Sequence, residues 1–124
     1  MILGNFGNNE KIIWTVHSKG KMRQYGFSEK RVLRIFRKPD RIEEGIAPKT
    51  IAAMQITGTK KHPTEVWMMY QIINPKPRTQ NLKSKTIRII SAWRYPGRTP
   101  IGARPQIPQD TLDNLQDILK TTNN

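Results

Sequence analysis

The stretch over residues 85–94 constrains the fold more than any other part of the sequence. It reads Lys-Thr-Ile-Arg-Ile-Ile-Ser-Ala-Trp-Arg and is rich in β-branched residues. Four apolar or small residues in succession, Ile89 to Ala92, are typical of a strand that is covered on both faces. The Pro96-Gly97 pair that follows removes a ladder donor and ends the strand. We therefore expect a central strand here, with the rest of the chain packed around it.

Two helices are expected ahead of this strand. The first begins after Thr15, whose hydroxyl suits an N-cap, and closes at Gly26, which accepts a left-handed conformation. The second begins after Ser28, another good N-cap, and ends where Pro39 disfavours a helical residue before it.

The segments between the helices and the central strand alternate apolar runs with turn residues. We expect strands over residues 41–45, 50–57 and 65–73, a short edge strand over 11–14, and a solvated loop over 74–84. The loops are too short for a crossover helix, so these strands should be antiparallel. The predicted fold class is α+β: two N-terminal helices packed on an antiparallel sheet of three to four strands, with a C-terminal helix after a Pro/Gly linker.

The expected domain organisation has four parts. A flexible N-terminus covers residues 1–10, and one α+β domain covers 11–95. A linker over 96–108 then leads to an amphipathic C-terminal helix and tail over 109–124. This helix would dock on the sheet or contact a second protomer, which makes a homodimer an alternative.

The charge indicates what class of partner the chain prefers. There are 22 Lys and Arg residues against 9 Asp and Glu, a formal net charge of +13, and the surplus lies in the body while residues 95–124 are neutral. A domain this basic attracts polyanions, because each phosphate that it neutralises releases counterions. The absence of cysteine, of a signal peptide and of an apolar run long enough to span a membrane favours a cytoplasmic protein.

The second predicted helix carries the most clearly basic face. Its cations recur at helical spacing, and an ordinary solvated face would mix positive with negative side chains. We predict that this face binds nucleic acid, with the ring of Trp93 as a stacking surface; the cations are Lys30, Arg31, Arg34, Arg37, Lys38 and Arg41. The alternative is a solvated helix face with no ligand.

Two segments of the sequence resemble the BrnT-like branch of the RelE-type ribonuclease toxins. The first runs from Trp14-Thr15-Val16-His17 through Lys21 to Tyr25-Gly26-Phe27-Ser28. The second, Arg88-Ile89-Ile90-Ser91-Ala92-Trp93-Arg94, is similar to the family's Arg-Ile-Ile-Ser-Ala-Arg run. Two departures stand beside the resemblance. Trp93 shifts the arginine by one residue and so to the opposite face of a regular strand, and Pro96-Gly97 replaces the helix that usually follows.

The resemblance implies a metal-independent endoribonuclease with an antitoxin as an acidic protein partner. Metal-free cleavage needs a base for the 2′-hydroxyl and cations for the phosphate. The candidate catalytic residues are His17, Lys21, Arg88, Arg94 and Tyr95. Each also has an ordinary structural interpretation: His17 as a capping or surface residue, Lys21 as a solvated one, and the arginines as partners of Glu43 or Glu44.

No cofactor or metal site is predicted, because the sequence has two histidines, no cysteine and no metal-ligand or phosphate-loop motif. The leading hypothesis is a small RNA-binding protein similar to a ribonuclease toxin. The alternatives are a non-catalytic nucleic-acid-binding module and an interaction protein that binds an acidic partner.

Overall fold

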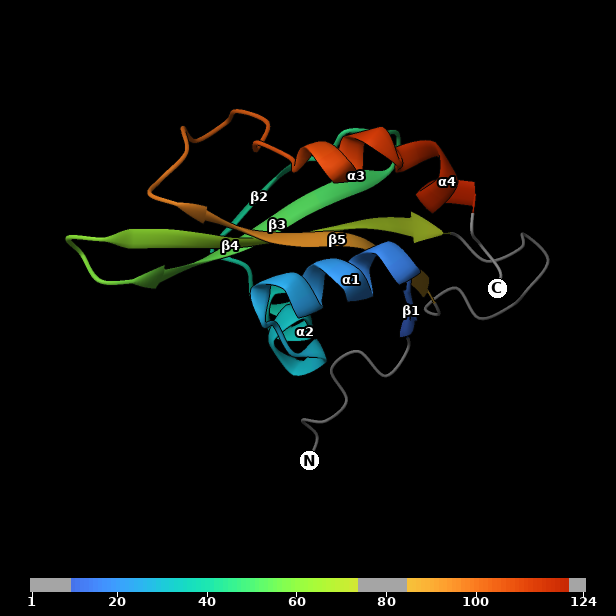
Figure 1. Ribbon diagram of the computed structural model, residues 1–124, viewed down its shortest axis with the longest axis horizontal. Coiled ribbons are helices and arrows are strands. Elements are labelled where there is room, and N and C mark those ends of the chain that lie inside the picture. The colour runs from blue at the N-terminus through green and yellow to red at the C-terminus, as the bar shows by residue number, and fades with distance from the viewer. Residues whose placement is uncertain (1–9, 74–84, 121–124) are drawn as a thin grey trace.

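The computed structural model describes residues 10–73 and 85–120, which form one five-stranded sheet with helices on both faces (Figure 1). Its strands are β1 (Glu10–Trp14), β2 (Arg41–Glu44), β3 (Thr50–Gly58), β4 (Pro63–Ile73) and β5 (Lys85–Pro96). Their order in the sheet is β1-β5-β4-β3-β2. The strand that most constrained the sequence, β5, thus lies inside the sheet between β1 and β4.

The predicted α+β class is confirmed, but the predicted sheet is corrected in two respects. The described residues form five strands instead of three to four, and β1 pairs in parallel with β5 while the other neighbours are antiparallel. The expected edge strand near residue 11 is present as β1, and its partner is β5, which lies far from it in the sequence. The expected loop over 74–84, and nearly all of the expected flexible N-terminus, lie outside the described residues.

Helices α1 (Val16–Tyr25) and α2 (Glu29–Arg37) follow the predicted capping signals. The Thr15 hydroxyl accepts from the backbone N–H of Ser18, and the Ser28 hydroxyl accepts from that of Arg31. Gly26 ends α1 at φ 76°, a left-handed conformation that a residue with a Cβ adopts only with strain. Local capping chemistry therefore sets the helix boundaries.

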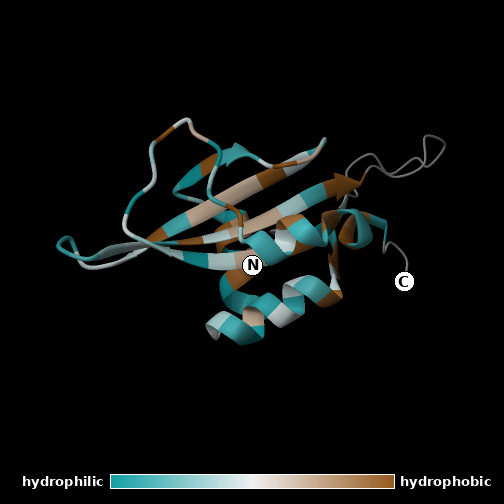
Figure 2. Cartoon of the chain, turned by 45° about the horizontal axis from the view of Figure 1, so that its top comes forward, coloured by the Kyte–Doolittle hydropathy of each residue, from teal (hydrophilic) through white to brown (hydrophobic). Residues whose placement is uncertain are grey.

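The two faces of the sheet bury separate hydrophobic cores (Figures 1 and 2). Under α1 and α2, the first core includes Val32, Ile35, Val66, Met68 and Ile89. The second core lies under α3 (Gln109–Asp113) and α4 (Leu115–Lys120); it includes Met54, Trp67, Met69, Ile90, Trp93 and Ile118. Because both faces are covered, β4 and β5 carry long runs of buried side chains without alternation.

A β-bulge interrupts β5 near its middle. Tyr70 pairs with Ile89 and Met69 pairs with Ser91, so Ile90 is an extra residue between them. Ile90 packs in the second core, and the hydroxyl of Ser91 also reaches the C-terminal helices, at Thr111. Regular alternation from Arg88 would place Trp93 on the face of the first core and Arg94 on the face of the second. Because of the bulge, the two residues have the reverse arrangement.

Helix α1 runs along the edge of β5 that β1 leaves open. Strand β1 pairs with β5 only as far as Ile89. The next residue, Thr15, continues the hydrogen bonding to β5. Its backbone N–H and its hydroxyl both donate to the carbonyl of Ile89, at 3.3 and 2.8 Å. An uncovered edge offers unpaired backbone groups to other chains, and α1 covers this one. As a result α1 contacts both layers, with Met22 in the first core and His17 and Lys21 directed at α3.

Candidate nucleic-acid interface

The first core ends at the surface in four side chains that we name the arginine–aromatic cluster: Tyr25, Phe27, Arg31 and Arg94. The rings of Tyr25 and Phe27 stack with centroids 5.6 Å apart. The guanidinium carbons of Arg31 and Arg94 lie 5.5 and 4.9 Å from the centroid of Phe27. Both distances are within the range of cation–π attraction, so the buried ring of Phe27 holds two arginines side by side.

Three elements bring these side chains together. Phe27 lies in the short turn between α1 and α2, and Arg31 lies in the first turns of α2. Arg94 comes from β5, where it pairs with Val66 of β4 beyond the bulge. The bulge places Arg94 on the same face as the first core, where the ring of Tyr25 lies 5.9 Å from its guanidinium carbon.

The charged groups of the cluster are all positive. Burial, followed by the nearby charges of Arg94 and Arg34, lowers the pKa of Arg31 from its ordinary value. The guanidinium still stays charged, because arginine is not deprotonated in proteins. Among the residues that the structure describes, no carboxylate forms an ion pair with Arg31, Arg34 or Arg94. Like charges held together in this way lower their energy when an anion binds between them.

The rest of the predicted basic face divides into two groups. Lys30, Arg34, Arg37 and Lys38 are exposed along α2 and its C-cap, and they extend the positive surface next to the cluster. Arg41 does not extend it, because β2 begins at this residue and directs the side chain to the second face of the sheet. The helical spacing that suggested one continuous stripe ends at Pro39.

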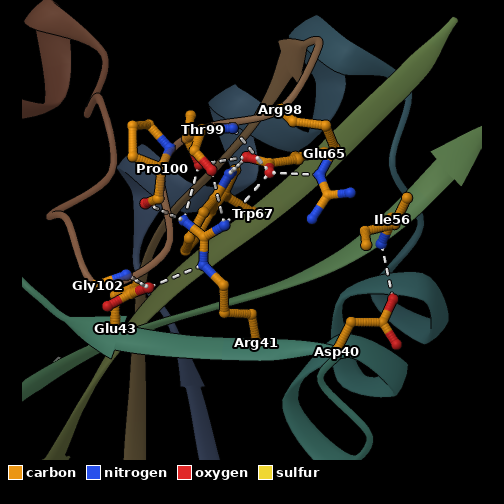
Figure 3. Close-up of polar contacts among 10 residues, drawn as sticks. All are labelled: Asp40, Arg41, Glu43, Ile56, Glu65, Trp67, Arg98, Thr99, Pro100 and Gly102. Atoms are coloured by element: carbon orange, nitrogen blue, oxygen red, sulfur yellow. Dashed lines mark hydrogen bonds and ion pairs between the residues drawn. The ribbon is translucent and has the colours of Figure 1, made fainter.

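Arg41 belongs instead to a network around the buried carboxylate of Glu65 (Figure 3). Its guanidinium contacts Glu65 at 3.5 Å and lies over the ring of Trp67, and its Nε lies 2.8 Å from Glu43 without hydrogen-bond alignment. It also donates to the hydroxyl of Thr99 at 2.7 Å. Arg41 is thus a structural cation that ties β2 to the segment after β5.

Glu65 is fully buried and accepts from several donors. The backbone N–H of Thr99 donates at 3.0 Å, the Thr99 hydroxyl at 2.7 Å, the Trp67 indole at 3.0 Å and Arg98 Nε at 3.2 Å. Burial would raise the pKa of Glu65, but the hydrogen bonds from Thr99, Trp67 and Arg98 outweigh it and hold the pKa below its ordinary value. This carboxylate holds the predicted linker against the sheet.

Trp93 does not lie at the surface as a stacking ring. It is 2% exposed and stacks on Trp67 with centroids 6.1 Å apart, inside the second core. Its place beyond the bulge explains the difference, because Trp93 and Arg94 point to opposite faces. The structure therefore offers the arginine, and not the tryptophan, to a ligand.

The candidate catalytic residues on α1 are engaged by α3. His17 Nε2 lies 2.8 Å from the Thr111 hydroxyl, which is also 2.8 Å from the hydroxyl of Ser91. Lys21 is buried and contacts both carboxylate oxygens of Asp110 at 3.1 Å. Burial lowers the pKa of His17; the charge of Asp110 opposes this shift and that of Lys21 adds to it.

The candidate catalytic residues on β5 lie far from one another. Arg88 is buried, donates to Gln71 at 2.6 Å and to the carbonyl of Leu119 at 3.1 Å, and so anchors the end of α4. Arg94 is six residues further along the strand, about 20 Å away, and on the opposite face. Tyr95 packs at the margin of the second core. The five predicted catalytic residues are not brought together into one site.

Sequence reasoning missed Tyr25 and Phe27 as parts of the interface and Glu65 as a structural carboxylate. A local signal for Phe27 is its place just before the N-cap Ser28, where an apolar residue often packs against the first turns of the helix, but nothing local indicates two arginines over it. Within residues 10–73 and 85–120, no group of three or more His, Cys, Asp or Glu residues could hold a metal ion. No described helix is long and apolar enough to cross a membrane.

Comparisons with known proteins give no relative for this chain: no family model, no curated protein and no solved structure matches it.

Proposed function

We propose that this protein binds RNA, with the arginine–aromatic cluster and the exposed cations of α2 as the phosphate-binding surface. The observation that carries the proposal is the placing of Arg31 and Arg94 on one ring without a carboxylate partner among the described residues. The repulsion between the two guanidinium groups is relieved when a phosphate binds between them. The net charge of +13 would draw that polyanion in.

The test is an affinity measurement with purified full-length protein and a fluorescently labelled RNA oligonucleotide. Removing one phosphate-binding arginine should weaken binding about tenfold, because a charged hydrogen bond contributes on the order of 1.5 kcal/mol. We expect this loss for Arg31→Ala and for Arg94→Ala, with a shallower dependence of affinity on salt. Lys11→Ala is the matched control, since Lys11 is exposed on β1 and pairs with Thr86 at the far end of β5. Equal affinity of the wild type and all three variants would contradict the proposal.

A second candidate, metal-independent RNA cleavage, is favoured by the position of His17. Burial lowers the pKa of His17, which favours the neutral form of the ring that a general base requires. The ring also lines an open groove of about 380 Å³ between α1 and α4, beside Asn114 and Asp117. Incubation of the protein with RNA in chelator tests this candidate. Cleavage that His17→Ala abolishes would support it, and intact RNA would leave binding as the function.

The antitoxin-like partner implied by the resemblance remains a proposal of the same kind. An acidic segment would find its complement on the arginine–aromatic cluster, and it would compete there with RNA.

A further inference from the structure

One end of the sheet carries cations at its tip and on both of its faces. The tip is the loop between β3 and β4, where Lys60, Lys61 and His62 are all exposed. Arg94 lies on the face of the first core and Arg98 on the face of the second. We call these five residues the basic end of the sheet.

Strand pairing explains why they meet at one end. Gly58 pairs with Pro63 to close the β3–β4 hairpin, and Thr64 pairs with Pro96, so β5 ends beside the hairpin base. Gly58 has φ 85°, and an added Cβ would lie 2.4 Å from the carbonyl oxygen of His62, so the tight turn needs glycine. The loop projects beyond the ends of the other strands (Figure 1), and the hairpin is hydrophilic there (Figure 2).

The second face of this end has room for a phosphate. A hollow of about 420 Å³ lies at the base of the hairpin, and Lys60 and Arg98 are the cations among its lining residues. Arg98 uses its Nε to contact Glu65, while its side chain is 44% exposed. On the first face, Arg94 and Arg31 offer the corresponding cations. The basic end therefore presents positive charge to two separate anionic strands.

Aromatic exposure distinguishes between single-stranded and double-helical ligands. Proteins that bind single strands usually stack bases on exposed aromatic rings. None of the aromatic residues in the described ranges is fully exposed: Trp67 and Trp93 are in the second core, and Phe27 lies under two arginines. The partly exposed ones are Trp14, Tyr25, Phe36 and Tyr95. The cations of the basic end can bind phosphates, but the surface offers few aromatic rings on which unpaired bases could stack.

We propose that the ligand of this protein is double-helical RNA, with the loop over residues 59–62 lying over the minor groove and the two faces of the basic end contacting the phosphates of the two strands. The inference rests on the proposed RNA binding. In A-form RNA the minor groove is wide and shallow, so a hairpin tip reaches it without base-specific contacts. Recognition would depend on helix shape and would be largely independent of sequence.

The test compares three labelled ligands of one sequence, each about 20 nucleotides per strand: single-stranded RNA, duplex RNA and duplex DNA. The two duplexes carry the same number of phosphates, so a preference between them reports helix geometry rather than total charge. We expect duplex RNA to bind at least about tenfold more tightly than single-stranded RNA, and several-fold more tightly than duplex DNA.

The hairpin variant Lys60→Ala/Lys61→Ala should weaken binding to duplex RNA about tenfold and binding to single-stranded RNA much less. The matched control is Lys11→Ala/Lys49→Gly, which removes one exposed lysine from β1 and one from the turn between β2 and β3; Lys49 has φ 64°, which glycine accepts. Circular dichroism spectra would verify that each variant is folded.

The outcomes separate this inference from the function on which it rests. Single-stranded RNA binding that equals or exceeds duplex binding would overturn the inference and leave RNA binding in place. The inference would also be overturned if the hairpin variant and the control behaved alike, or if duplex DNA bound as well as duplex RNA. Failure to bind any of the three ligands would overturn both proposals.

Discussion

Glu65 is the residue on which the packing of the segment after β5 depends. Its carboxylate is fully buried among donors from Arg41, Trp67, Arg98 and Thr99. Glu65→Gln keeps the shape but leaves the buried guanidinium of Arg41 without a charge partner at this position, a change that costs about 3 kcal/mol. We expect the free energy of unfolding in urea to fall by this amount.

The same carboxylate makes stability depend on acid pH. Since the pKa of Glu65 lies below its ordinary value, the native state binds fewer protons than the unfolded chain in acid. Its stabilisation is therefore complete above about pH 4.5 and is lost as the pH falls below that value. The urea midpoint of the wild type should fall more steeply over this range than that of Glu65→Gln. The exposed control Glu44→Gln should keep both the slope and, within about 0.5 kcal/mol, the stability.

The spacing of residues in the sequence does not determine which arginines form ion pairs with carboxylates. Arg37 and Arg41 are four residues apart, which would place them one turn apart on a continuous helix. Pro39 ends the helix between them, and strand β2 begins at Arg41. Arg41 then meets Glu65, which comes 24 residues later in the chain. Arg94 is predicted as a catalytic residue from its place at the strand end and from the family resemblance, and its contact with Phe27 joins segments that are far apart in the sequence. Such partners are tertiary, so local patterns carry no signal for them.

At the scale of elements, we expect the stability of the junction of α1 with α3 to depend on pH near neutrality. His17 bonds to the buried hydroxyl of Thr111, with Lys21 and Asp110 beside it and Asp117 lining the same groove. Because the pKa of His17 is lowered, mainly by burial, the unfolded chain binds its proton more readily than the folded one. The stabilisation is therefore complete above the ordinary value near 6.5 and is lost as the pH falls below it.

We expect the urea midpoint to fall between about pH 7.5 and about pH 5.5, where Glu65 is still ionised. His17→Gln keeps a hydrogen-bonding side chain but cannot titrate, so its midpoint should change less over this interval. If the variant and the wild type lost stability in parallel, protonation of His17 would not be the cause.

Element boundaries follow from capping and turn chemistry, which is local and therefore readable in the sequence. Thr15, Gly26 and Ser28 occupy the predicted cap positions, and the predicted strands begin or end within a few residues of the observed ones. The bulge at Ile90 has no such local signal, because the run Ile89 to Ala92 suits burial on either face. The bulge reverses the faces of Trp93 and Arg94, and so places in the second core the tryptophan that is predicted to stack on nucleic acid.

For the whole molecule, the limit of sequence reasoning was the pairing of β1 with β5. The antiparallel order from β2 to β5 follows from short connections, but β1 and β5 meet across most of the chain. The C-terminal helices were equally ambiguous, since an amphipathic helix of that length suits a sheet face or a second protomer. In the structure, Leu115, Ile118 and Leu119 of α4 pack on the second core of the sheet.

The net charge of +13 should make salt act in opposite directions on stability and on RNA binding. Self-repulsion destabilises the compact state, and salt screens it, so the free energy of unfolding should rise when NaCl increases from about 50 to 200 mM. RNA affinity should fall over the same interval, because bound phosphates no longer release as many counterions. For about four phosphate contacts to a single strand the loss is about fifty-fold, and it is larger for a duplex. Titrations and urea unfolding in the same buffers measure both effects. A rise of both quantities would contradict the expected release of counterions on RNA binding, and a fall of both would contradict the expected relief of self-repulsion.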